Sequence, residues 1–261
     1  MFCFKRIILV YIVILFLCIF ASCDNKIKNS YLGISKVEVT CNLYAEIPHL
    51  EIYVFSSVDY DNLTLKKNKL IKEVNGYRSD IKLINKEKEF KGYLYLFYIT
   101  FEKKEFILQE LTFLFDNKEI KCPIGIYQTI FLEPSTIDID SSINIYMDNS
   151  LKALFNIHNK LYSEAYLVEQ RIVSIRKKQT LEPFVLDKIM INAGGIKSLD
   201  IFSINPKEKY HQVGGIVQTR FKTNLDEHII YTSYYYNNMY NLNYLSSIGI
   251  DISSLEEVKN S

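Results

Sequence analysis

The sequence contains no tryptophan, and it has only 9 glycines and 5 prolines among 261 residues. It also lacks an excess of charge of one sign, because 31 Lys and Arg stand against 30 Asp and Glu. Proteins that bind nucleic acid through its phosphates carry a basic surface, so this balance argues against nucleic acid as a partner. Apolar residues make up 48% and charged residues 23%. These values exclude collagen, low-complexity disorder and a multi-span membrane protein.

Sequence motifs for catalysis, nucleotide binding and metal binding are missing as well. There is no Gly-x-Ser-x-Gly elbow and no phosphate-binding loop, and the Gly-Gly pairs at 194–195 and 214–215 are expected in hairpins or bulges. Asp138 and Asp140 are interpreted as part of a solvated sheet face. Four histidines lack metal-ligand spacing: His49, His158, His211 and His228. We therefore predict no enzyme, and no catalytic, cofactor-binding or metal-binding residues.

Aromatic residues are abundant, with 20 Tyr and 16 Phe, and together with β-branched residues they favour strands. Alternation of period 2 predicts six or seven short strands within residues 33–133 and a second set after the break at residues 133–136. The fold class expected is mainly β, with two tandem antiparallel β-sandwiches over residues 33–135 and 136–245 and a C-terminal tail over 246–261. This architecture is similar to tandem immunoglobulin-like domains, although without Trp no Cys-Trp-Cys signature exists.

Several local patterns refine this expectation. Residues 92–102 and 106–115 are predicted to form one hairpin, and Asp116-Asn117-Lys118 is predicted to be the turn of another. Residues 150–175 fit strands, but apolar residues at helical spacing leave a helix as the alternative. The last residues, 251–261, fit a capped turn of helix or a frayed tail.

The N-terminal segment carries the most specific pattern of the chain. Lys5 and Arg6 precede an uninterrupted apolar run over residues 7–20, which is followed by Ala21, Ser22 and Cys23. At about 1.5 Å per residue, residues 7–22 span roughly 24 Å, which is less than the ~30 Å of a bilayer core. The pattern is typical of a signal peptide rather than of a permanent transmembrane helix.

The sequence Phe20-Ala21-Ser22-Cys23 resembles the lipobox of bacterial lipoproteins, which signal peptidase II cleaves before the cysteine; Phe20 stands where Leu or Val is usual. The resemblance implies a lipoprotein signal peptide over residues 1–22, acylation of Cys23 and a polar tether over residues 23–32. Acyl chains on Cys23 would hold the chain on the extracytoplasmic face of the cell membrane or outer envelope. The alternatives are an uncleaved N-terminal anchor helix, and ordinary cleavage that leaves Cys23 as a free thiol.

Two further cysteines, Cys41 and Cys122, remain in the part of the chain expected outside the cytoplasm. An even pair in an oxidising compartment is a candidate disulfide. The alternative is two separate buried thiols that pack as small apolar side chains.

Tyrosine and asparagine are concentrated in residues 231–244, as they are in many protein-binding surfaces. This segment is either a contact patch for an envelope protein or glycan, or a last strand that packs alternate tyrosines inside. The candidate patch consists of Tyr231, Tyr234, Tyr235, Tyr236, Tyr240 and Tyr244.

The function expected is that of a lipid-anchored cell-envelope protein with a non-catalytic binding or structural ectodomain. One alternative is an enzyme or accessory factor of envelope metabolism with a site in the interdomain cleft, where pockets are frequent. Another is a solute-binding lipoprotein of a transporter, which would need two α/β lobes.

Overall fold

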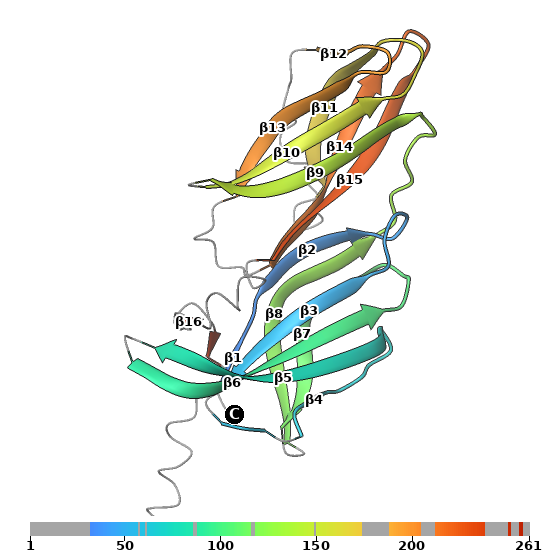
Figure 1. The fold of residues 1–261 in the computed structure, drawn as a ribbon. Coiled ribbons are helices and arrows are strands. Elements are labelled where there is room, and N and C mark those ends of the chain that lie inside the picture. The colour runs from blue at the N-terminus through green and yellow to red at the C-terminus, as the bar shows by residue number, and fades with distance from the viewer. Residues whose placement is uncertain are drawn as a thin grey trace, which may run out of the picture.

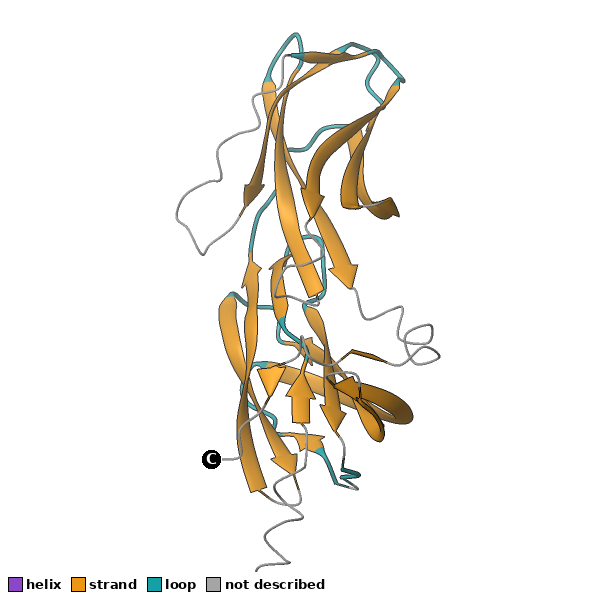
Figure 2. Cartoon of the chain, turned by 90° about the vertical axis from the view of Figure 1, so that its left-hand side faces the viewer, coloured by secondary structure: helices purple, strands orange, loops and turns teal. Residues whose placement is uncertain are grey.

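The computed structural model describes residues 32–56, 58–60, 62–85, 88–115, 118–148, 150–173, 188–204, 212–237, 250–251 and 256–257. All regular elements within these ranges are strands, so the fold is mainly β, as predicted (Figure 2). The same ranges contain no helix long and apolar enough to cross a membrane. The predicted signal peptide and Cys23 lie outside the described residues.

The first half of the chain forms two sheets that enclose one apolar core. One sheet has the order β16-β5-β6-β3-β1-β17, and the facing one contains β2, β8, β7 and β4 (Figure 1). The strand bounds are β1 (Leu32–Ile34), β2 (Val37–Asn42), β3 (His49–Ser56), β4 (Thr64–Leu65), β5 (Ile71–Asn85), β6 (Lys88–Phe101), β7 (Phe106–Phe115), β8 (Lys118–Ile130), β16 (Ile250–Asp251) and β17 (Glu256–Glu257).

The alternation of side chains along β3 explains how this strand contributes to the core between the two sheets. Ile52 and Val54 point into the core, as alternate residues on one face of a strand do. Phe101 of β6 stacks on Tyr127 of β8 with ring centroids 5.1 Å apart, which joins the two sheets through aromatic side chains. Tyr53 is also buried, so the second face of β3 is covered too.

The second half also has two facing sheets and its own core. One sheet has the order β13-β10-β9, and the other contains β12, β11, β14 and β15, with Phe155, Leu167 and Phe221 among the buried residues. Of residues 150–175, which were predicted to be strands with a helix as the alternative, 150–159 and 165–173 form strands, and 174–175 lie outside the described residues. The strand bounds are β9 (Ile139–Asp148), β10 (Ser150–Asn159), β11 (Ala165–Val173), β12 (Ile189–Ile191), β13 (Ile196–Ile204), β14 (Gln212–Lys222) and β15 (Glu227–Asn237).

One sheet runs through both halves. The first residues of β14 pair in parallel with β2, with Gln212 opposite Val37 and Gly214 opposite Val39. Further along, β14 pairs with β11 of the second half, and β15 accompanies it over its whole length. Figure 1 shows β14 and β15 extending from the second half down to the start of β2. The two cores are therefore connected by backbone hydrogen bonds and not only by the linker.

The structure corrects two of the local predictions. Strands β6 and β7 do not form a hairpin, because β3 and β5 occupy both edges of β6 and the chain crosses to the other sheet after Phe101. The prediction of a helical turn or a frayed tail over residues 251–261 is also wrong where the residues are described, since Asp251 pairs with β5 and Glu256 with β1.

Candidate functional site

A buried polar network joins the two halves. Gln212 of β14 donates a hydrogen bond from Nε2 to the main-chain carbonyl of Glu51 on β3, at 2.7 Å. The Glu51 carboxylate accepts hydrogen bonds from the amide of Asn237 at 2.8 Å and from the hydroxyl of Tyr53 at 3.1 Å. Tyr235 donates to Oε1 of Gln212 at 2.6 Å. Buried polar groups are costly unless paired, so this network fixes the end of the β14–β15 pair against β3.

Two glycines allow the close approach of β14, β15 and β2. A Cβ at Gly215 would lie 2.7 Å from the hydroxyl of Tyr234 and 2.9 Å from its ring, and a Cβ at Gly214 would lie 3.1 Å from the main-chain oxygen of Tyr234. Gly214 and Gly215 thus lie inside β14, and not in a hairpin or bulge as expected. Gly215 lets the Tyr234 ring lie across the strand, and Gly214 leaves room for the Tyr235 ring and Val39.

A pocket of about 260 Å³, the junction pocket, opens beside this network. Its walls come from both halves: β2 and the loop after it, the start of β3, β9 and the end of β15. The lining residues are Val39, Thr40, Cys41, Glu46, His49, Ile143, Ser233, Tyr234 and Tyr235.

The pocket combines an acid with aromatic side chains. Glu46 carries the formal negative charge among the lining residues, and no Lys or Arg belongs to the lining. His49 donates from Nδ1 to the main-chain carbonyl of Ile47 at 3.1 Å, which leaves Nε2 as an acceptor in the neutral ring. The His49 and Tyr235 rings are 6.5 Å apart, and Tyr235 is 38% exposed at the opening.

The Cys41 thiol lies in the pocket wall and is protonated at neutral pH. Burial, followed by the nearby negative charge of Glu46, raises the pKa of Cys41 to about 12. The thiol donates to Glu46 Oε2 at 3.7 Å. The thiolate is the nucleophilic form of cysteine, so this raised pKa lowers the nucleophilic reactivity of Cys41.

The candidate disulfide between Cys41 and Cys122 is not formed, since both are buried free thiols. In the parallel pair of β2 and β8, Cys41 stands opposite Thr129, which follows Cys122 by seven residues. At about 3.3 Å per residue the two cysteines are roughly 20 Å apart along the strands, whereas a bridge needs Cβ atoms within ~4 Å. The alternative of two separate thiols is the one found.

The tyrosines of the candidate contact patch are divided between two faces of β15. Tyr231 and Tyr235 alternate with Tyr234 and Tyr236, so they point to opposite sides of the strand. Burial raises the pKa of Tyr236. Tyr234 and Tyr235 reach the junction pocket, while Tyr240 and Tyr244 lie outside the described residues.

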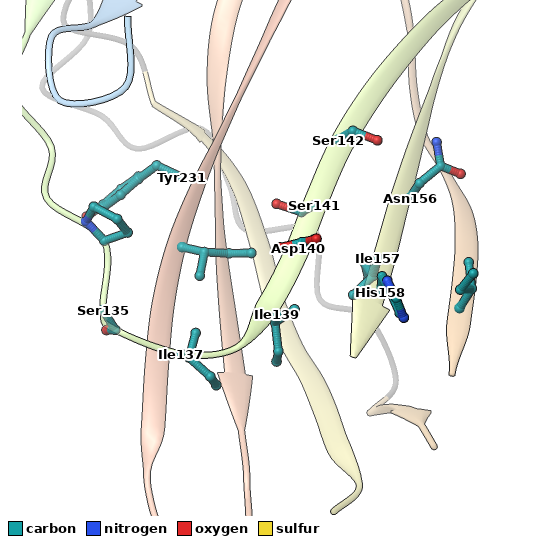
Figure 3. A pocket seen from close by; sticks show the side chains of 13 residues that line it. Ser135, Ile137, Ile139, Asp140, Ser141, Ser142, Asn156, Ile157, His158 and Tyr231 are labelled. Atoms are coloured by element: carbon teal, nitrogen blue, oxygen red, sulfur yellow. The ribbon is translucent and has the colours of Figure 1, made fainter. Parts of the chain in front are cut away.

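A second hollow, of about 580 Å³, lies beside β9 in the second half and contains a serine, a histidine and an aspartate (Figure 3). These three residues do not form a catalytic triad. Ser141 bonds to Thr232 on the inner side of β9, whereas Asp140, its neighbour in the strand, points to the opposite face. The Asp140 carboxylate pairs with Lys160 at 2.5 Å and not with His158.

The other residues considered from the sequence do not converge. The main-chain N–H of Lys160 donates to the main-chain carbonyl of Asp138, whereas the ammonium group of Lys160 pairs with the carboxylate of Asp140. His228 lies at the start of β15, and His211 is outside the described residues. Within the described ranges, no group of three or more His, Cys, Asp or Glu side chains has the geometry of a metal site.

Sequence reasoning missed most of the junction residues. Gln212, Asn237 and Glu46 are ordinary polar residues at strand ends or in a loop, and nothing local distinguishes them. Glu51 did carry a signal, because a charged residue within the apolar run of β3 implies a buried polar partner.

The chain matches no known family model, and no curated protein is significantly similar to it.

Proposed function

We propose that this chain is a lipid-anchored bacterial cell-envelope protein whose ectodomain binds a ligand at the junction pocket without chemical conversion. Its two halves are proposed to be tandem immunoglobulin-like β-sandwiches, divided near residue 135 and held together by the shared strand β14. The proposed ligand is a cationic side chain, such as lysine, presented by another envelope protein.

The observation that carries this proposal is the composition of the pocket. A carboxylate, Glu46, lines the pocket together with Tyr234 and Tyr235, without a lining Lys or Arg. An ammonium group is attracted both by a carboxylate and by the face of an aromatic ring. The volume of about 260 Å³ suits one side chain rather than a whole domain.

Rigidity of the site supports recognition. The end of β15, which carries Tyr234 and Tyr235, is held by hydrogen bonds from Gln212 and Asn237 to Glu51. A site that is already ordered pays less conformational entropy on binding than a mobile one. A shared sheet that orders both walls of the pocket therefore favours a binding function.

The anchor completes the proposal. Acylation of Cys23 would place the pocket outside the cytoplasm, where envelope proteins present their lysines. Intact mass measurement of the membrane-extracted protein tests the anchor: residues 1–22 are expected to be absent, with added acyl mass on Cys23. An unacylated Cys23 would refute the anchor and leave the pocket proposal to its own test.

The two alternatives have weaker support. A solute-binding lipoprotein needs two α/β lobes, whereas the described elements are strands. An enzyme with Cys41 as its nucleophile is disfavoured, because burial holds the Cys41 thiol protonated.

Substitution at Glu46 tests the pocket directly. The full chain in lipid nanodiscs is titrated calorimetrically with the peptide acetyl-Gly-Lys-Gly-amide. Glu46→Gln is expected to weaken binding at least about tenfold, since a hydrogen bond to a charged group contributes about 1.5–3 kcal/mol. Glu102→Gln, at an exposed site outside the pocket, is the matched control and should bind like the unchanged protein. Equal affinities for Glu46→Gln and the unchanged protein would refute the proposal.

A further inference from the structure

A separate cavity of about 400 Å³ lies in the first half, where the edge strands of its two sheets face each other. Strand β5 is the outer strand of one sheet over residues 74–78, since β16 pairs only with its residues 83–84, and β4 is the edge of the other sheet (Figure 1). Val74 and Gly76 of β5 and Phe97 of β6 line one side, and Leu63 and Leu65 line the other. The cavity shares no lining residue with the junction pocket.

Gly76 contributes to the cavity. Gly76 stands opposite Phe97 in the β5–β6 pair. Val74, two residues earlier on the same face of β5, packs against the core. A Cβ at Gly76 would meet the Phe97 ring at 3.5 Å, an ordinary contact distance. A larger side chain at this position would extend into the cavity, so the absence of a side chain at residue 76 leaves part of this space open.

The wall of the cavity is held in place in the absence of a ligand. The main-chain N–H of Tyr60 donates to the hydroxyl of Tyr95 at 2.7 Å, and the Tyr60 and Phe115 rings are 5.1 Å apart. Arg78 binds both oxygens of the Asp59 carboxylate, one residue before Tyr60. These contacts fix the segment before β4 against both sheets.

One positive charge among the residues that line the cavity has no ion-pair partner in the described ranges. Arg78 is neutralised, because it pairs with Asp59 and Asp80 and also lies 4.7 Å from the centre of the Tyr93 ring. Lys66, next in sequence to Lys67, pairs with Glu119. Lys67 lines the cavity, is exposed, and has no ion pair with any residue in the described ranges.

We propose that this cavity binds a single-chain aliphatic carboxylate, with the alkyl chain between Leu65 and Phe97 and the carboxylate at Lys67. The apolar walls suit the chain, and the uncompensated ammonium group selects an anionic head over a neutral or cationic one. This binding site is independent of the junction pocket and of the function proposed for it.

Titration with short fatty acids tests the proposal. The full chain in lipid nanodiscs is titrated with [1-¹³C]octanoate below its micellar concentration, and the carboxyl resonance is followed by NMR, with empty nanodiscs as the blank. Saturable binding is expected. Octanoate should bind about fourfold more tightly per methylene than hexanoate, since a buried methylene contributes about 0.8 kcal/mol. Octanol and octylammonium should bind at least tenfold more weakly than octanoate.

Three variants connect this binding to the cavity. Gly76→Leu fills the space and should abolish binding, and Gly76→Ala, which makes no close contact, should weaken octanoate more than hexanoate. Lys67→Gln should remove the preference of octanoate over octanol, while Lys69→Gln, at an exposed position outside the lining, should preserve it. Thermal unfolding confirms that each variant is folded.

Three results would overturn the proposal. The first is octanoate binding no stronger than to empty nanodiscs. The second is octanoate affinity unchanged by both Gly76 substitutions. The third is tighter binding of a short-chain lysophosphatidate than of octanoate, which would assign the cavity to a lipid headgroup instead.

Discussion

The side-chain amide of Gln212, at the start of β14, donates a hydrogen bond to the main-chain carbonyl of Glu51 on β3. These residues belong to opposite halves of the chain and are brought together by the parallel pairing of β14 with β2. The contact makes the junction an ordered part of the fold, in which a pocket has walls from both halves.

The junction network contributes to stability. Asn237→Ala removes the amide that donates to the buried Glu51 carboxylate and should lower the free energy of unfolding by about 1–3 kcal/mol. Denaturant unfolding followed by circular dichroism measures this change. Asn224→Ala, in the exposed turn between β14 and β15, is the control and should stay within about 0.5 kcal/mol. Equal stability of the two variants would contradict the role of the network.

Two glycines of the chain should respond oppositely to the same substitution. Gly215→Ala places a methyl group 2.7 Å from the Tyr234 hydroxyl and 2.9 Å from its ring, so it should destabilise the protein by about 1–3 kcal/mol. Gly76→Ala makes only ordinary contacts and should stabilise β5 by about 0.5–1 kcal/mol. Thermal unfolding of both variants checks the prediction, which fails if Gly215→Ala is the more stable of the two.

The buried thiols should be unreactive in the folded protein. Iodoacetamide at pH 8 is expected to leave Cys41 and Cys122 unmodified in the native state and to alkylate both after denaturation without reductant. Peptide mass spectrometry distinguishes the two sites. A requirement for reductant before alkylation would show a disulfide and contradict the structure.

Alkaline pH should destabilise the protein partly through Cys41. Its pKa is about 12 in the folded state against 9.0 for an unperturbed thiol, so the unfolded chain loses this proton first as the pH rises. The thiol's contribution to stability is complete below pH 9 and is lost between about pH 9 and 12. Cys41→Ala should therefore show a shallower loss of stability over this interval. Identical pH profiles for the variant and the unchanged protein would contradict the pKa assignment.

Local sequence patterns were sufficient to predict much of the fold. Alternating apolar residues predicted a set of strands in each half, and the break predicted after residue 115 agrees with the end of β7 at Phe115 and the start of β8 at Lys118. Strand β5 was missed because it is an edge strand whose exposed residues 75–80 are largely polar, so it shows no alternation.

The junction could not be predicted from local patterns. The pairing of Gln212 with Val37 joins residues far apart in the sequence, and parallel pairing leaves no turn signal. The Gly214–Gly215 pair was interpreted as a turn because the Tyr234 ring that requires it lies on another strand. The contact patch was proposed from composition, whereas the alternative of a last strand already implied that alternate tyrosines point to opposite faces, as they do in β15.

The most direct test of the proposed function compares two ligands that differ in one charge. The full chain in nanodiscs is titrated with acetyl-Gly-Lys-Gly-amide and with the same peptide carrying Nε-acetyllysine, which keeps the aliphatic stem but loses the ammonium group. Recognition by Glu46, Tyr234 and Tyr235 predicts saturable binding of the lysine peptide, at least about tenfold tighter than that of the acetylated one. Equal affinities, or no saturable binding of the lysine peptide, would contradict it.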